Sequence, residues 1–273
     1  MSNQCAHGHS HGDAASAGNP PQGHGHGHGH THGHGHGHAT HDFAATNRAY
    51  FDEYAKNGDE AFAGWRDMAR KEIDAMRARW PPLFDKEHTV VLDFACGVGP
   101  IAWEGMISEQ LIPHVKKIVG VDISQVSVDR YNALATEKLG LTPEKMKAVN
   151  VELKGEEGEL DGIKFDLVVC CSSFHHFASI DDTTRLLMSF LKPGGALLVA
   201  DIKAADDGHQ LFPEGYHGVV PHRHGITEVR LRTTFEGAGL GAFEFHDAAT
   251  HTLPHDPNGE EATWFIARGV KPE

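Results

Sequence analysis

Five apolar runs, separated by segments of helical character, constrain the fold of this chain more than any other feature of its sequence. The runs cover 89–95, 117–123, 145–149, 165–172 and 195–202. The first four have the β-branched weighting of parallel strands that are buried on both faces. Helical patterns cover 100–111, 124–140, 181–192 and 227–240, and two further strand-like runs cover 242–248 and 262–269. This alternation predicts an α/β fold with a Rossmann-like, doubly wound, seven-stranded, mostly parallel sheet and helices on both faces.

The composition changes near residue 41, and this divides the chain into a tail and a domain. Residues 1–41 are mostly Gly, His, Ser, Ala and Asn with no periodic apolar face, which predicts a disordered His/Gly-rich tail. The domain is predicted over 42–273, a length that can bury a full core. It opens with helices within 42–82 that have an apolar stripe. Residues 203–226 are rich in His, Gly and Pro and exceed a normal connection, which predicts a substrate lid.

Charge and hydropathy exclude several classes of protein. The net charge of −14 disfavours nucleic acid as a partner, because phosphate binding depends on Lys and Arg. No apolar run approaches the roughly 20 residues of a membrane-spanning helix, and Met1–Ser10 lacks the apolar centre of a signal peptide. The four cysteines show no disulfide spacing. We therefore expect a cytoplasmic protein with no membrane partner.

The first strand runs into a glycine-containing turn in "VVLDFACGVGP". The turn has the pattern A-x-G-x-G at Ala95, Gly97 and Gly99, and Ala102 stands where a dinucleotide fingerprint has its third glycine. Asp93 precedes the turn, where a carboxylate would repel a pyrophosphate held over a helix N-terminus. A cofactor with a sulfonium, an amino group and no phosphate suits this acid better. The turn therefore favours S-adenosyl-L-methionine over a nicotinamide cofactor.

Four segments in order resemble a known family. They are "VLDFACGVGP", "VGVDIS", "FDLVVCCSSFHHF" and "LKPGGALLVADI". Together they resemble the class I S-adenosylmethionine-dependent methyltransferases over about residue 40 to the end. The opening "NRAYFDEYA", together with "FHHF", "FEGAGL" and "FIARGVKP", is similar to uncharacterised small-molecule-type methyltransferases of fungi. One departure is Ala95, where the family usually has Gly and where a methyl group narrows the approach of the cofactor's carboxylate end.

The resemblance implies a role for each matching residue. It places the methionine amino group at Asp93 and the methionine moiety along the backbone of Ala95, Gly97 and Gly99. It places the ribose at Asp122, whose carboxylate ends the second strand. Taken alone, this acid would be compatible with S-adenosyl-L-methionine or with a nicotinamide cofactor. The remaining implied contacts are Ile123 against the adenine, Glu152 and Leu153 near the adenine amino group with Asn150 as the alternative, and Ser172 and Ser173 beside the sulfonium. For Glu152, a solvated surface acid is an equally good interpretation.

A direct displacement needs an aligned acceptor and sometimes a base. His175 and His176 follow the fourth strand and are the candidate catalytic residues, with an orienting or packing role as the alternative. Asp201 is interpreted as a structural acceptor rather than a base. In the predicted lid, His217, His222 and His224 are secondary candidates for substrate contact.

Two features suggest metal. Cys170, Cys171, His175 and His176 resemble a zinc set, but adjacent strand residues point to opposite faces, so no structural zinc is predicted there. The alternating His-Gly tract from His24 to His38 can wrap zinc, nickel or copper, and a low-complexity tail without such a role is the alternative. Cys96 on the turn needs no nucleophilic role.

The sequence therefore favours a methyltransferase that acts on O, N or S of a small-molecule acceptor. The alternative is a metal-binding protein that uses its His-rich tail and keeps a non-catalytic methyltransferase-like fold. Aminopropyl transfer on the same fold is a third hypothesis, disfavoured because no paired acids are placed for a polyamine.

Overall fold

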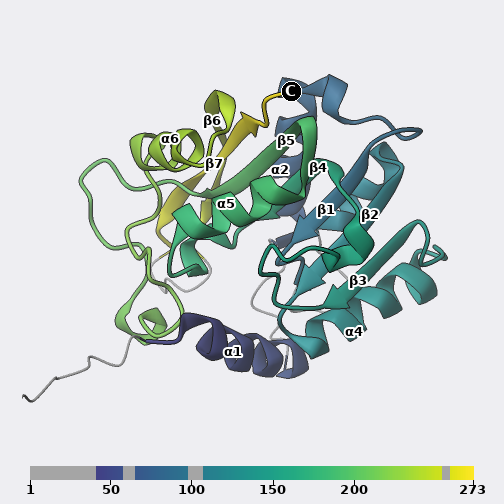
Figure 1. Ribbon diagram of the computed structural model, residues 1–273. Coiled ribbons are helices and arrows are strands. Elements are labelled where there is room, and N and C mark those ends of the chain that lie inside the picture. The colour runs from purple at the N-terminus through teal and green to yellow at the C-terminus, as the bar shows by residue number, and fades with distance from the viewer. Residues whose placement is uncertain (1–40, 58–64, 98–106, 254–258) are drawn as a thin grey trace, which may run out of the picture. The chain divides into compact units, whose positions relative to one another are not determined.

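A seven-stranded sheet in the order β3-β2-β1-β4-β5-β7-β6 forms the centre of the protein in the computed structural model (Figure 1). The structure describes residues 41–57, 65–97, 107–253 and 259–273. The strands are β1 Val90–Phe94, β2 Lys117–Asp122, β3 Met146–Asn150, β4 Phe165–Cys171, β5 Leu191–Ile202, β6 Gly241–Thr252 and β7 Glu261–Val270. The first five pair in parallel, and β7 pairs antiparallel with β5 and β6. The predicted fold class is confirmed.

The sequence leaves the order of the last two strands open, and its pattern places the start of β5 too late. In the structure β7 lies between β5 and β6, so the last strand of the chain is inserted beside β5. β5 begins at Leu191, four residues before the predicted start at 195, because Leu191 already pairs with Phe165 before a register shift. Strand ends of this kind depend on the partner strand, which local sequence does not specify.

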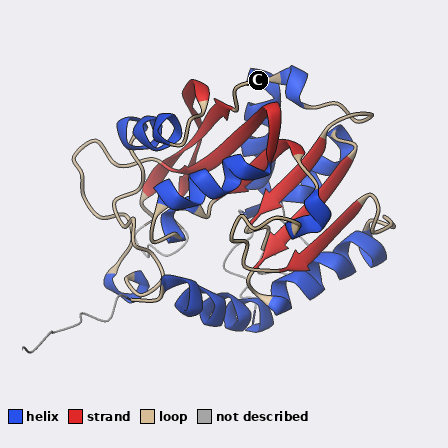
Figure 2. Cartoon of the chain, viewed as in Figure 1, coloured by secondary structure: helices blue, strands red, loops and turns tan. Residues whose placement is uncertain are grey.

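Helices cover both faces of the sheet (Figure 2). They are α1 Phe43–Asn57, α2 Trp65–Arg79, α3 Ile107–Leu111, α4 Gln125–Ala133, α5 Ile180–Phe190 and α6 Glu228–Gly237. A π-helical turn, Leu134–Lys138, continues α4. Of the helix predicted over 100–111, residues 100–106 lie outside the described residues.

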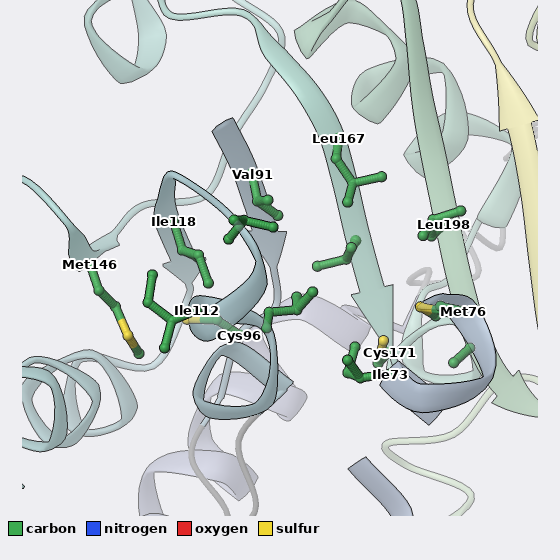
Figure 3. Close-up of a cluster of buried hydrophobic side chains, with 14 of the residues drawn as sticks. Ile73, Met76, Val91, Cys96, Ile112, Ile118, Met146, Leu167, Cys171 and Leu198 are labelled. Atoms are coloured by element: carbon green, nitrogen blue, oxygen red, sulfur yellow. The ribbon is translucent and has the colours of Figure 1, made fainter. Parts of the chain in front are cut away.

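The core has two layers, one on each face of the sheet. Figure 3 shows the first, in which Ile73 and Met76 of α2 face side chains of the central strands, such as Cys171. The second contains apolar residues of α5 and α6 together with Cys170. Adjacent strand residues alternate between the two layers, so Cys170 and Cys171 pack on opposite faces of β4. This is the arrangement for which the sequence predicts no zinc site at these two residues.

The chain changes direction across the sheet between β1 and β4, where open α/β sheets place their ligands, at the carboxyl ends of the strands. The residues that follow these two strands are strained. Ala95 has φ +55° and Ser172 has φ +50°, a left-handed backbone that costs an L-residue about 1–2 kcal/mol. Strain of this kind concentrates at functional sites.

Helix α1 lies below the sheet in Figure 1 and is tied to it by side chains along its length. Asp42 caps its first turn by accepting a hydrogen bond from the Ala45 N–H at 3.0 Å. Ser124 Oγ donates to Asp52 at 2.6 Å, and Asn47 Nδ2 donates to the His176 carbonyl at 3.2 Å. None of the described helices is both long and apolar enough to cross a membrane.

Candidate active site

A cavity of about 520 Å³ opens between the carboxyl ends of the central strands and α1. Its walls come from α1, α2, the turn after β1, the ends of β2 and β4, β7 and the 203–226 segment. Most of the walls are apolar, which is typical of a small-molecule site in which a few polar groups set the orientation. The family resemblance also implies that the helices within 42–82 cover the cofactor, and of these α1 contributes Tyr50, Phe51 and Tyr54 to the lining.

The turn after β1 brings backbone and a carboxylate together. The Gly97 N–H donates to Asp122 Oδ2 at 2.9 Å, and the Ser124 N–H donates to Asp122 Oδ1 at 2.8 Å. Burial raises the pKa of Asp122, and these two backbone donors oppose that rise. Each carboxylate oxygen keeps a further lone pair for a ligand hydroxyl. Ala95, Gly97 and Asp122 all line the cavity, while predicted Gly99 lies outside the described residues.

Asp93 lies below the turn and is not part of the cavity lining that the structure describes. Its carboxylate accepts from Ser108 Oγ at 2.6 Å, and Ser108 Oγ in turn accepts from the Tyr131 hydroxyl at 2.7 Å. Burial raises the pKa of Asp93 to about 7, while Ser108 opposes and Asp122 adds to the rise. Its contact with a methionine amino group stays a prediction.

The predicted adenine side of the cavity contains Ile123, Glu152 and Leu153. Glu152 pairs with Arg48 of α1 at 3.0 Å, and Arg48 Nε also donates to the Ile123 carbonyl at 3.3 Å. Asn150, the predicted alternative, donates to the Asp122 carbonyl and does not line the cavity described here. Arg48 was not identified from the sequence, because nothing local to α1 indicates a partner a hundred residues away.

His175 and Asp201 form a buried pair at the end of β4 and β5. The His175 ring Nδ1 lies 2.6 Å from Asp201 Oδ1, and the His175 N–H donates to Asp201 Oδ2 at 3.2 Å. Burial alone raises the pKa of Asp201, but the charge and hydrogen bonds of His175 outweigh it and hold that pKa below its usual value. An ionised Asp201 accepts a hydrogen bond from Nδ1–H, so that in the neutral imidazole the lone pair is on Nε2. Asp201 thus acts as the predicted structural acceptor.

His176 has a different environment. Its Nδ1 donates to the Val219 carbonyl at 2.8 Å, and its ring meets Phe51 edge-on. Burial, together with the neighbouring His175, lowers the pKa of His176 to about 3. A neutral imidazole with so low a pKa is a hydrogen-bond acceptor rather than an effective base near neutral pH.

Several buried polar atoms on the cavity lining have no hydrogen-bond partner among the described residues. They are Asn47 Oδ1, both Glu72 carboxyl oxygens, Ser172 Oγ and Trp264 Nε1. Buried polar groups in proteins are nearly always paired, so these atoms are available to bind the polar groups of a ligand. Ser173, also predicted beside the sulfonium, lines the cavity, but its Oγ donates to the Cys171 carbonyl.

Sequence reasoning missed Glu72. It falls on the apolar stripe of α2, four residues after Met68 and one before Ile73, and its exposed fraction is 0%. An acid in the middle of a buried helical stripe is a signal that the sequence does contain.

The predicted lid contributes aromatic and apolar residues to the wall, and its histidines are used elsewhere. Phe212, Tyr216 and Val220 line the cavity. The secondary candidates His217, His222 and His224 are not in the described lining and contact Arg223, the Phe177 carbonyl and the Gly208 carbonyl, respectively.

No described group of three or more His, Cys, Asp or Glu residues can hold a metal ion. The His-Gly tract lies outside the described residues. Cys96 is buried beneath the turn, where a Cβ added at Gly120 would lie 2.8 Å from its Sγ. Burial raises the pKa of the Cys96 thiol well above its usual value, so a packing role accounts for it.

Comparison with known proteins gives the family. The family model described as a methyltransferase domain matches residues 65–242, about two thirds of the chain. The chain belongs to this family. An uncharacterised methyltransferase of Schizosaccharomyces pombe is 37% identical over 160 residues, which cover 56% of this chain and 54% of that protein. The alignment therefore spans about half of the yeast relative. A ubiquinone biosynthesis O-methyltransferase of Coxiella burnetii is 22% identical over 75% of this chain and 88% of its own.

Solved structures share the fold of this methyltransferase-domain protein. Phosphoethanolamine N-methyltransferase 2 of Haemonchus contortus, in complex with S-adenosyl-L-methionine, has a TM-score of 0.57 at 15% identity, covering 85% of this chain and 60% of that one. Magnesium protoporphyrin IX methyltransferase from Synechocystis, with the same cofactor bound, has a TM-score of 0.53 at 19% identity, covering 85% of this chain and 99% of that one. At these identities the likeness concerns the fold.

Proposed function

We propose that this protein transfers the methyl group of S-adenosyl-L-methionine to an O, N or S atom of a small-molecule acceptor. The observation that carries the proposal is the cavity at the switch point, with unpartnered buried polar atoms around an otherwise apolar lining. When bound, the cofactor supplies an electrophilic methyl group on a sulfonium. The protein's own residues then have to bind and orient the cofactor and the acceptor, exclude water from the cavity and accept a proton from the acceptor.

The residues on the turn side of the cavity fit this cofactor. Asp122, fixed by two backbone N–H groups, is assigned to the ribose hydroxyls. Ile123 and Leu153 offer apolar surface for the adenine, with Glu152 at the edge. Ala95 also lines the cavity and carries only a methyl side chain.

His175 is the candidate base. Asp201 fixes its ring so that Nε2 carries the lone pair, the arrangement in which a buried carboxylate orients an imidazole for proton transfer. Its ring also stacks on Phe212 with 4.9 Å between centroids, which restricts its rotation at the cavity wall. His176, held neutral, is assigned a positioning role beside α1.

Two experiments test the proposal. Calorimetry with S-adenosylhomocysteine should show binding that weakens at least about tenfold in Asp122→Asn, because an amide has one acceptor oxygen and cannot accept from both backbone donors. Asp129→Asn, which removes the same charge from the exposed face of α4, is the matched control and should bind normally.

The second experiment follows radiolabelled methyl groups into a cell extract. Label should enter the small-molecule fraction and require wild-type protein. Label found only in protein or nucleic acid would contradict a small-molecule acceptor, and absence of S-adenosylhomocysteine binding would contradict the whole proposal.

A further inference from the structure

The cavity continues beyond the turn to a region enclosed by α2, β7 and the 203–226 segment. Its wall there is an apolar cluster with several aromatic rings. The members that line the cavity include Tyr50, Met68, Ile202, Phe212, Tyr216 and Trp264. Tyr50 and Tyr216 pack against the same cluster, and burial, with Tyr216 as the second cause, raises the pKa of Tyr50. This region is distinct from the residues assigned to the cofactor and has the composition of an acceptor site.

Glu72 is the exception in this apolar wall. Its side chain lies one helical turn after Met68, and neither carboxyl oxygen has a partner among the described residues. Burial, with Asp201 as the second cause, raises the pKa of Glu72 to about 8. A carboxyl group buried without a hydrogen bond costs several kcal/mol and is rarely kept without a ligand to satisfy it.

The ionisable side chains that line the cavity are mainly acidic. Four lining residues carry carboxyl groups, namely Glu72, Asp122, Glu152 and Asp182, and Glu152 is paired with Arg48. In the part of the chain that the structure describes, no Lys or Arg lines the cavity. The segments 1–40, 58–64, 98–106 and 254–258 contain no Lys or Arg in their sequence either. A phosphate or carboxylate on the acceptor would thus be buried in this cavity without a counter-charge on the lining. A cation would be stabilised by Glu72 and by the faces of the aromatic rings.

We propose that the acceptor is an organic amine, protonated in water, whose ammonium group pairs with Glu72 while its apolar part packs against Phe212, Tyr216 and Trp264. This inference rests on the proposed function for the identity of the reaction, but it concerns the recognition of the acceptor. Glu72 anchors the charged end of the molecule, and the anchor by itself does not decide which atom receives the methyl group.

Pairing with an ammonium group changes the protonation of Glu72. Free Glu72 is mostly neutral at pH 7, and an ammonium group beside it favours the ionised form, so binding releases a proton. The titratable groups around Glu72 are Asp201 of β5 and Cys171 of β4, with His175 paired to Asp201. Asp201 stays ionised and burial keeps the Cys171 thiol neutral, so neither of them supplies the proton.

The test uses the full-length protein saturated with S-adenosylhomocysteine and three probes of similar shape. Phenethylamine is cationic, 2-phenylethanol is neutral and 3-phenylpropanoate is anionic. Calorimetry should give the amine at least about tenfold tighter binding than the alcohol, and no measurable binding of the anion. Glu72→Gln should remove this preference and leave S-adenosylhomocysteine affinity unchanged. Asp74→Asn, an exposed acid on the same helix, should change neither.

A second measurement needs no variant. In the wild-type protein, the amine should bind more tightly by roughly tenfold per pH unit between pH 6 and pH 7, with proton release detected as a buffer-dependent enthalpy.

Equal binding of amine and alcohol, or binding of the amine that is independent of pH and of Glu72, overturns the inference and leaves the proposed function intact. If the wild-type protein does not bind S-adenosylhomocysteine but still binds the amine more tightly than the alcohol, the proposed function is contradicted and the cation site is supported.

Discussion

Replacing Glu72 by glutamine is expected to stabilise the free protein, by an amount that grows with pH. The carboxyl has an ordinary pKa of 4.5, and burial raises it to about 8 in the folded chain. Below pH 4.5 it is protonated in both states and has no effect. Between the two values only the unfolded chain ionises, so the free energy of unfolding falls as pH rises, and the loss is complete above pH 8.

The magnitude follows from the two pKa values. A difference of about 3.5 pH units at 1.36 kcal/mol per unit corresponds to a total loss of about 5 kcal/mol, of which about 4 kcal/mol falls between pH 5 and pH 8.5. Glutamine has a similar shape and does not titrate. Neither Glu72 oxygen has a described hydrogen-bond partner, so the substitution removes no observed contact.

Urea unfolding at pH 5, 6.5, 7.5 and 8.5, followed by circular dichroism, measures the difference between wild type and Glu72→Gln. We expect that difference to increase by about 4 kcal/mol over this range, while Asp74→Asn shows no comparable trend because its exposed ion pairs contribute little. A difference that does not change with pH, or a Glu72→Gln protein that is less stable throughout, would refute the assignment of Glu72 as an unpartnered buried acid.

Three further predictions address the strained turn, the base and the tail. Ala95→Gly should raise the free energy of unfolding in urea by about 0.5–1 kcal/mol. Glycine adopts φ +55° without the steric cost, although the greater flexibility of the unfolded glycine chain cancels part of this gain. A lower free energy of unfolding would mean that the turn is not strained. Asp201→Asn should lower kcat about 100-fold or more through misorientation of His175, with S-adenosylhomocysteine affinity unchanged, and an unaltered kcat would remove His175 as the base. A chain that begins at Thr40 should keep its affinity for S-adenosylhomocysteine and lose nickel binding, whereas lost cofactor affinity would implicate the tail in the site.

Local sequence was sufficient for much of the fold. The apolar runs specify where strands lie, because a strand buried on both faces needs a continuous apolar segment. The turn at Ala95 and Gly97, and the acids Asp93 and Asp122 at the strand ends, follow from the same local pattern together with the rule that parallel strands present their carboxyl ends on one edge. Each of these features is encoded within one strand and the turn that follows it.

Only the tertiary structure decided which distant residues share the cavity. Arg48 meets Glu152 because α1 crosses the strand ends, and His175 meets Asp201 because β4 pairs with β5 in a particular register. Glu72 and Trp264 line one wall because β7 inserts beside β5 and α2 packs over the sheet, an arrangement that no periodicity in either segment encodes. The periodicity of apolar residues determines which face of a helix or strand is buried. The element against which that face packs depends on the order and register of the strands in the whole sheet.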